Sequence, residues 1–143
     1  MAIFFVKILI KRWSIIIKTG VDIIEVERIK ENIEKYGNAF LNRIFTEKEI
    51  EYCESKNVQK YQSYAARFAA KEAVFKAISE CLNNKYEIEW KNIEILNDKN
   101  CRPYVNLNNS FFKNEIFVNL KIDISISHIN NIAISTVVCN IWK

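Results

Sequence analysis

Glycine, proline and histidine are scarce in this chain of 143 residues, which contains two Gly, one Pro and one His. So few turn-forming residues are atypical of a loop-rich protein. The four cysteines, Cys53, Cys81, Cys101 and Cys139, are irregularly spaced and form no C-x-x-C pair. With a single histidine beside them, neither a zinc site nor a disulfide framework is indicated. We therefore expect the thiols to be reduced.

The chain also lacks a long hydrophobic run and a strong excess of either charge. Residues 1–12 are apolar with basic interruptions, and the uninterrupted runs are far shorter than the ~20 residues that cross a bilayer. They also lack the charge order and cleavage site of a secretory signal. The net charge of +4 suits an acidic partner or a phosphorylated ligand. Acids and bases are mixed, without a dense basic stripe, so we expect neither a nucleic-acid nor a membrane partner.

Half of the residues are hydrophobic, which provides for a packed core in a chain of single-domain length. A capping box at Thr46 and Glu49 and a C-terminal glycine, Gly37, mark helix boundaries. The hydrophobic spacing predicts helices over 25–36, 46–55 and 59–82, and strands over 15–24, 93–96, 104–107, 120–127 and 132–141. This order predicts an α+β fold, with helices packed on one face of an antiparallel sheet.

The helix predicted over 59–82 carries two pairs of charged residues with helical spacing. Glu72 and Lys76 are four residues apart and share one face, and Arg67 and Lys71 form a second such pair. Pairs of this kind are usually solvated surface features. Taken alone, the pattern does not separate a site from an ordinary helix surface.

The strand predicted over 15–24 adds the second part of the pattern. It carries one acid, Asp22, among β-branched residues, and a carboxylate there is costly to bury unless a positive charge neutralises it. A strand acid, a helix acid and several cations on that helix are the groups that a metal–diphosphate site requires. We therefore predict that these two elements meet.

Five sequence blocks occur in an order typical of one enzyme family. They are Gly20–Ile23 with Glu25 and Arg28, Phe45–Ile50, Ala65–Ala73 with Lys76, Ile93–Asp98 before Pro103–Val105, and Ile124–His128. In this order the chain resembles the holo-acyl-carrier-protein synthases, a branch of the 4′-phosphopantetheinyl transferases. The resemblance covers about residues 14 to 139 and implies one transferase domain over 14–143, with residues 1–13 as an N-terminal extension.

The resemblance implies a Mg²⁺-dependent enzyme that moves 4′-phosphopantetheine from coenzyme A to a serine of apo-acyl carrier protein. Asp22 and Glu72 are then the metal ligands, because Mg²⁺ accepts few protein ligands and completes its shell with waters and phosphates. Lys76 is the catalytic cation, which stabilises charge as the diphosphate bond breaks. The alternative interpretation is structural. Asp22 then only ends a strand, and Glu72 and Lys76 only form an ion pair on the helix.

The resemblance also assigns residues to the two substrates. It implies that Arg67, Lys71 and His128 bind the coenzyme, and that Arg28 meets the acidic carrier protein. A solvated helix edge is an equal alternative for Lys71. His128 could instead be a structural residue at a strand end. Arg28 could lie on an ordinary amphipathic helix, because acids and bases alternate around it.

The chain departs from the family in two places. Ile78–Lys85 stands where members usually have a Gly-rich loop, and Lys18 replaces a glycine before the first motif. The family is typically a homotrimer with sites between subunits, which the resemblance extends to this chain. We expect a cytoplasmic protein, or one in a plastid-type organelle if residues 1–12 derive from a targeting segment. The alternative functions are a non-catalytic coenzyme A- or carrier-binding protein and a metal-dependent nucleotide hydrolase.

Overall fold

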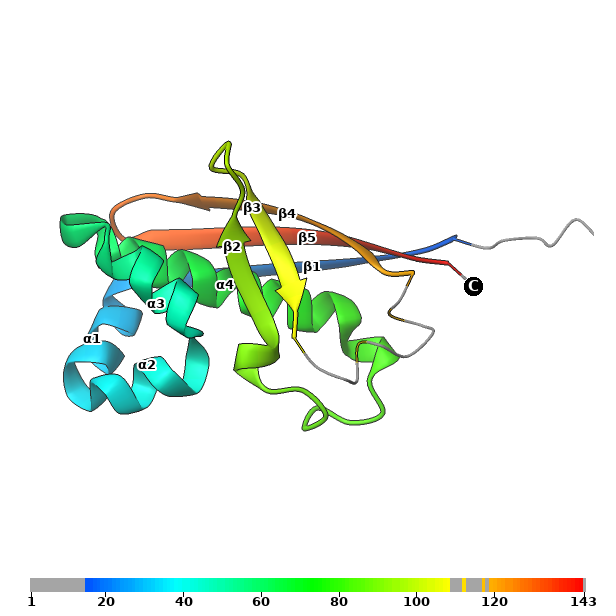
Figure 1. Ribbon diagram of the computed structural model, residues 1–143, viewed down its shortest axis with the longest axis horizontal. Coiled ribbons are helices and arrows are strands. Elements are labelled where there is room, and N and C mark those ends of the chain that lie inside the picture. Colours follow the sequence, from blue (N-terminus) through cyan, green and yellow to red (C-terminus); the bar gives the residue numbers. More distant parts are fainter. Residues whose placement is uncertain (1–14, 109–111, 113–116, 118, 143) are drawn as a thin grey trace, which may run out of the picture.

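The computed structural model describes residues 15–108, 112, 117 and 119–142 (Figure 1), so the predicted extension over 1–13 lies outside the described residues. In chain order the elements are β1 (Ile15–Glu25), α1 (Val26–Tyr36), α2 (Asn38–Ile44), α3 (Glu47–Glu54), the 3₁₀ turn η1 (Asn57–Gln59), α4 (Lys60–Ile78), η2 (Ser79–Cys81), η3 (Trp90–Asn92), β2 (Ile93–Asn97), β3 (Pro103–Leu107), β4 (Lys121–His128) and β5 (Ile132–Trp142). None of the helices in these ranges is both long and apolar enough to cross a bilayer.

The strands form two antiparallel sheets. The first has the order β1-β5-β4, and the second is the β2–β3 hairpin. Helix α4 runs along one face of the first sheet and packs mainly on β1 and β5, while α1, α2 and α3 gather near one end (Figure 1). The predicted α+β fold with helices on one face of an antiparallel sheet is confirmed, with the hairpin as a separate sheet.

Small residues bring α4 unusually close to β1. Ala70, Ala73 and Ala77 are at most 2% exposed, and Gly20 lies on the facing strand. A Cβ atom placed on Gly20 would lie 1.9 Å from the Ala73 carbonyl oxygen and 3.0 Å from the Ala77 backbone nitrogen. Only glycine therefore permits this approach. The contact sets how far the side chains of β1 lie from those of α4.

Local signals in the sequence fix several helix ends. Thr46 and Glu49 form the predicted capping box, and Gly37 ends α1 with φ 55° and an N–H donated to the Ile33 carbonyl. The helix predicted over 59–82 ends earlier, at Ile78, and continues as the η2 turn. Helix α2 was not predicted, because seven residues are too few for a clear hydrophobic period.

Candidate active site

The β1–α4 contact brings Asp22 and Lys76 together. Lys76 Nζ lies 2.8 Å from Asp22 Oδ1 and donates a second hydrogen bond, 2.9 Å long, to the Val21 carbonyl. The Asp22 side chain is 16% exposed and that of Lys76 is 50% exposed. The ammonium thus supplies the positive charge that a carboxylate in this strand needs. Lys76 still has enough exposed surface to meet a ligand.

Glu72 lies one helical turn before Lys76 and completes the group. Asp22, Glu72 and Lys76 line one cavity of about 340 Å³, together with Arg28 and Phe68; we call it the β1–α4 cavity. Burial raises the pKa of Glu72, and the nearby Asp22 carboxylate raises it further, while Lys76 acts in the opposite direction. Two carboxylates close enough to repel each other are an arrangement that a cation between them would stabilise.

These two carboxylates fit a Mg²⁺ ion better than most other metals. No group of three or more His, Cys, Asp or Glu side chains around a common point occurs in the described part of the chain. Zinc sites need such a set, whereas Mg²⁺ is commonly held by one or two carboxylates and the phosphates of a substrate. The donor set therefore suits a metal that acts together with a phosphorylated ligand.

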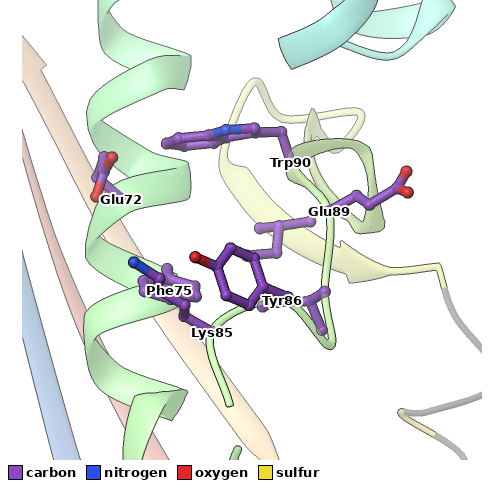
Figure 2. A pocket seen from close by; sticks show the side chains of 8 residues that line it. Glu72, Phe75, Lys85, Tyr86, Glu89 and Trp90 are labelled. Carbon is purple, nitrogen blue, oxygen red and sulfur yellow. The ribbon is translucent and has the colours of Figure 1, made fainter.

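A second cavity lies on the other side of Glu72. It measures about 310 Å³ and lies between α4 and the segment 85–93; we call it the α4–η3 cavity. Figure 2 shows the rings of Tyr86 and Trp90 projecting from that segment toward α4. The Trp90 ring stacks on Phe68, with 5.1 Å between centroids and an interplanar angle of 25°. Glu72 thus lines both a cavity with charged side chains of either sign and an aromatic cavity.

The aromatic lining was not predicted from the sequence. Tyr86 and Trp90 follow the long helix in a segment that alternates apolar and charged residues, a pattern typical of a strand, although the backbone forms no strand there. The available signal was this alternation, directly after the segment where the family has a Gly-rich loop.

The two departures from the family pattern contact each other. Lys18 on β1 forms an ion pair with Glu80 in η2, the turn that follows α4. The C-terminal end of α4 is thereby tied to the strand that carries Asp22. The contact involves no residue of the Asp22–Glu72–Lys76 group.

Arg67 lies elsewhere on α4. It is 5% exposed, its guanidinium stacks on the Tyr52 ring at 3.8 Å, and it donates a 2.8 Å hydrogen bond to Asn97 Oδ1. Its Nε has no hydrogen-bond partner, and it forms no ion pair, among the residues that the structure describes. Arg67 lines neither cavity. The structure therefore does not bring it to Glu72 within one chain.

Lys71 is fully buried. Its ammonium lies 2.8 Å from Glu49 Oε2 and donates to the carbonyls of Ile93, at 2.5 Å, and Trp90, at 3.1 Å. Burial lowers the pKa of Lys71, and the Glu49 carboxylate partly offsets that effect. An ammonium with three internal partners is not placed to meet a phosphate, so the structure does not favour Lys71 as a coenzyme ligand.

The structure separates His128 of β4 from Arg28 of α1. His128 is exposed at the end of β4 and pairs with Ala133 of β5, which pairs with Ile24 of β1. It therefore lies two strands from β1 and lines neither cavity. Arg28, in contrast, lines the β1–α4 cavity beside Asn32. Of the two, only Arg28 joins the predicted group within one chain.

Comparison with known proteins identifies the family. Residues 18–137 match the model of the 4′-phosphopantetheinyl transferase superfamily. This chain belongs to that superfamily. It is 46% identical to the holo-[acyl-carrier-protein] synthase of Protochlamydia amoebophila over 114 residues, which cover 80% of this chain and 89% of that protein. It is 45% identical to the enzyme of that name from Ruminiclostridium cellulolyticum over 125 residues, covering 85% and 90%.

A solved structure of the family has the same fold. The holo-(acyl-carrier-protein) synthase of Bacillus anthracis, in complex with CoA (3′,5′-ADP), superposes with a TM-score of 0.71 at 30% identity. The match covers 89% of this chain and 98% of that one. The arrangement of strands and helices around Asp22, Glu72 and Lys76 is therefore that of a family of transferases.

Proposed function

We propose that this protein is a holo-acyl-carrier-protein synthase. It transfers 4′-phosphopantetheine from coenzyme A to a serine of apo-acyl carrier protein and releases adenosine 3′,5′-bisphosphate. The observation that carries the proposal is the group formed by Asp22, Glu72 and Lys76 beside the β1–α4 cavity. The relatives named above, which this chain matches over at least 80% of its length, support the same activity.

Within this proposal, Asp22 and Glu72 hold Mg²⁺, which supplies positive charge against the diphosphate when it is bound. Lys76 presents its half-exposed ammonium to the same phosphate oxygens. The carrier serine oxygen gives up its proton to solvent and forms a bond to the β-phosphorus as the bond from that phosphorus to the bridging oxygen breaks. Lys76 then stabilises the charge that develops on the departing bisphosphate. Its hydrogen bond to the Val21 carbonyl orients the ammonium before the substrate arrives.

The two cavities suggest how the coenzyme lies. Its diphosphate belongs beside Asp22 and Lys76, because the cations and metal ligands are there. The α4–η3 cavity, with Phe75, Tyr86 and Trp90 in its wall, suits an aromatic or apolar part of the same molecule. Glu72, which lines both cavities, then marks the place where the two parts of the ligand join.

We further propose a homotrimer with sites between subunits. The outer face of the β1-β5-β4 sheet carries apolar side chains that are 37% to 64% exposed: Ile15, Ile17, Val21, Ile23, Ile134 and Val138. A group of exposed apolar side chains of this kind, here on β1 and β5, is typical of an interface. In such an assembly the exposed His128 can reach the coenzyme from a neighbouring subunit. Arg67 is 5% exposed and its Nε is covered by protein atoms, so its side chain would have to rearrange to do the same. We also propose that the protein is cytoplasmic.

The release of adenosine 3′,5′-bisphosphate tests the proposal against its alternatives. The protein is incubated with coenzyme A and Mg²⁺, with and without apo-acyl carrier protein, and the nucleotides are separated by chromatography. We expect bisphosphate only when the carrier is present. Release without a carrier would indicate a hydrolase, and binding of coenzyme A without release would indicate a non-catalytic protein.

A further inference from the structure

A fully buried ion pair joins α3 to α4. The side chains of Glu49 and Lys71 both have 0% exposure. Burying two charges is costly, and pairing alone seldom compensates for it unless further hydrogen bonds satisfy both groups. Glu49 Oε2 also accepts a 2.8 Å hydrogen bond from the Thr46 backbone N–H, and Oε1 accepts one of 2.8 Å from that of Ile95. The carboxylate is thus fully engaged by α3, α4 and β2.

The remaining bonds of Lys71 go to the wall of the α4–η3 cavity. Its ammonium donates to the carbonyls of Trp90, the first residue of η3, and of Ile93, which follows that turn; both residues line the cavity. Trp90 in turn lays its ring on Phe68 of α4. Lys71 therefore holds the backbone at both ends of a three-residue turn, and this backbone carries the aromatic wall.

Overall stability alone does not require this arrangement. A buried ion pair can usually be replaced by packed apolar side chains with little loss of stability. What an apolar pair cannot do is hold two carbonyl oxygens at fixed positions, because those contacts are directional. The charged pair is therefore suited to defining the geometry of the turn more than to supporting the core.

We propose that Lys71, held in place by Glu49, is a positioning residue that fixes the Trp90–Ile93 wall for coenzyme binding. The inference rests on the proposed function, which seats part of coenzyme A in the α4–η3 cavity. It assigns Lys71 a role that is indirect: the ammonium touches the protein backbone, and the backbone positions the side chains that meet the ligand.

The test uses the full chain with the double substitution Glu49→Gln and Lys71→Met, which removes both charges together and so avoids an unpaired one. The control is Ile141→Ala, which truncates a buried residue of β5 that lines neither cavity. Thermal midpoints are measured first, and calorimetric titration then gives the Kd for coenzyme A. We expect the double variant to bind coenzyme A roughly tenfold more weakly, with the KM for the carrier changed by less than about twofold. The control should lose stability and keep its coenzyme Kd.

An unchanged coenzyme Kd in the double variant, or an equal rise in Ile141→Ala, would overturn the inference. If the double variant does not fold, Lys71→Arg keeps the charge but alters both carbonyl contacts, and a several-fold rise in Kd is expected. Amide hydrogen exchange over residues 88–95 gives a readout without coenzyme. Faster exchange in this segment of the substituted protein, but not of the control, supports the anchoring. It does so even if the parent protein fails to bind coenzyme A, because that result would overturn only the proposed function. Unchanged exchange would contradict the anchoring.

Discussion

The Lys76 ammonium and the Asp22 carboxylate meet at 2.8 Å although 54 positions separate them in the sequence. One belongs to α4 and the other to β1, and the small residues between these elements make the contact possible. The proposed catalytic cation and the proposed metal ligand are thus placed together by backbone packing. The consequences of this packing can be tested separately from the chemistry.

Gly20→Ala tests the packing. Because the added Cβ would lie 1.9 Å from the Ala73 carbonyl oxygen, α4 must shift away from β1, at a cost of about 1–3 kcal/mol. The shift also separates Asp22 from Lys76, so transfer should fall by more than the stability loss explains. Urea unfolding and kcat measured on one preparation check both effects.

Gly37→Ala is the matched control for that change. Gly37 has φ 55°, where a side chain costs about 1–2 kcal/mol, but nothing lies within 4 Å of its added Cβ. It should lose stability and keep normal transfer. Equal losses of transfer in both glycine variants would count against a special role for the β1–α4 contact.

Glu72→Gln tests the metal ligand. Burial and Asp22 raise the pKa of Glu72, so its ionised form is disfavoured in the folded protein, and this penalty is present above the raised pKa and disappears at lower pH. Removing the charge should therefore leave the thermal midpoint of the metal-free protein at neutral pH unchanged or higher. Transfer should nevertheless fall by orders of magnitude, as a stopped transfer assay at saturating Mg²⁺ would show. Glu31→Gln, on the exposed side of α1, is the control that should change neither quantity.

The same pKa shift sets a pH dependence. A carboxylate binds Mg²⁺ only when ionised, so affinity should fall as the pH drops through the raised pKa of Glu72, above the ordinary value of 4.5. Titration with Mg²⁺ at a series of pH values, in the presence of coenzyme A, measures this. A loss of affinity confined to pH values below 4.5 would show that Glu72 is not a ligand.

Lys76→Met separates a catalytic cation from an ordinary surface ion pair. As a half-exposed partner of Asp22, Lys76 contributes only about 0–1 kcal/mol to stability. If Lys76 is the cation that stabilises the breaking diphosphate, its replacement should lower kcat by several orders of magnitude and weaken coenzyme binding far less. Lys76→Arg should not restore the rate fully, because a planar guanidinium cannot replace a compact ammonium. Single-turnover transfer measures the effect.

Lys18→Met provides the comparison. It removes another lysine that links β1 to the α4 region, through Glu80, and touches none of the three site residues. It should transfer at nearly the parent rate. If the Lys76→Met variant did the same, Lys76 would be a surface residue without a catalytic role.

Much of the candidate site could be predicted from the sequence, and the features that could not be predicted have physical causes. Asp22, Glu72 and Lys76 stand out because an acid in an apolar strand and an i,i+4 pair are local patterns, but only the family resemblance assigned them the proposed roles. Lys71 has the same helical spacing to Arg67 as Lys76 has to Glu72, but spacing does not tell which face of an alanine-rich helix is buried. Helix α4 is buried on more than one side, because it also packs on α3 and β2, and this tertiary packing determines that Lys71 is buried.

The aromatic wall and the division of the strands into two sheets lie beyond local patterns too. Tyr86 and Trp90 alternate with charged residues as in a strand, but the backbone there is irregular, so the pattern does not predict where their rings lie. The pairing of β5 with both β1 and β4 is a long-range choice that hydrophobic alternation alone does not determine.

Arg28→Ala tests the carrier surface. The residue lines the β1–α4 cavity from α1, where an acidic carrier helix could meet it. Since an exposed charge contact is worth about 0–1 kcal/mol, we expect a several-fold rise in carrier KM that exceeds any change in coenzyme affinity. Lys35→Ala, in the last turn of the same helix, should leave the carrier KM unaltered. Steady-state kinetics at low salt check both, and an unchanged KM for Arg28→Ala would contradict the assignment.

Ile17→Lys tests the proposed trimer. Ile17 is 64% exposed at the outer face of β1, and a charge there would have to be buried in any assembly that covers this face. Light scattering at micromolar concentration should show a trimer for the parent and a smaller species for the variant. Val58→Lys, at a residue that is 91% exposed in η1, should assemble normally. A parent protein that is monomeric would contradict the trimer.

The most direct test of the account is the mass of the carrier. The purified protein is incubated with coenzyme A, Mg²⁺ and apo-acyl carrier protein, and the intact carrier is then weighed by mass spectrometry. We predict a gain equal to one phosphopantetheine group on a single serine, abolished by chelation of Mg²⁺ and by Glu72→Gln. A carrier of unchanged mass, from a folded protein that still binds coenzyme A, would contradict the account.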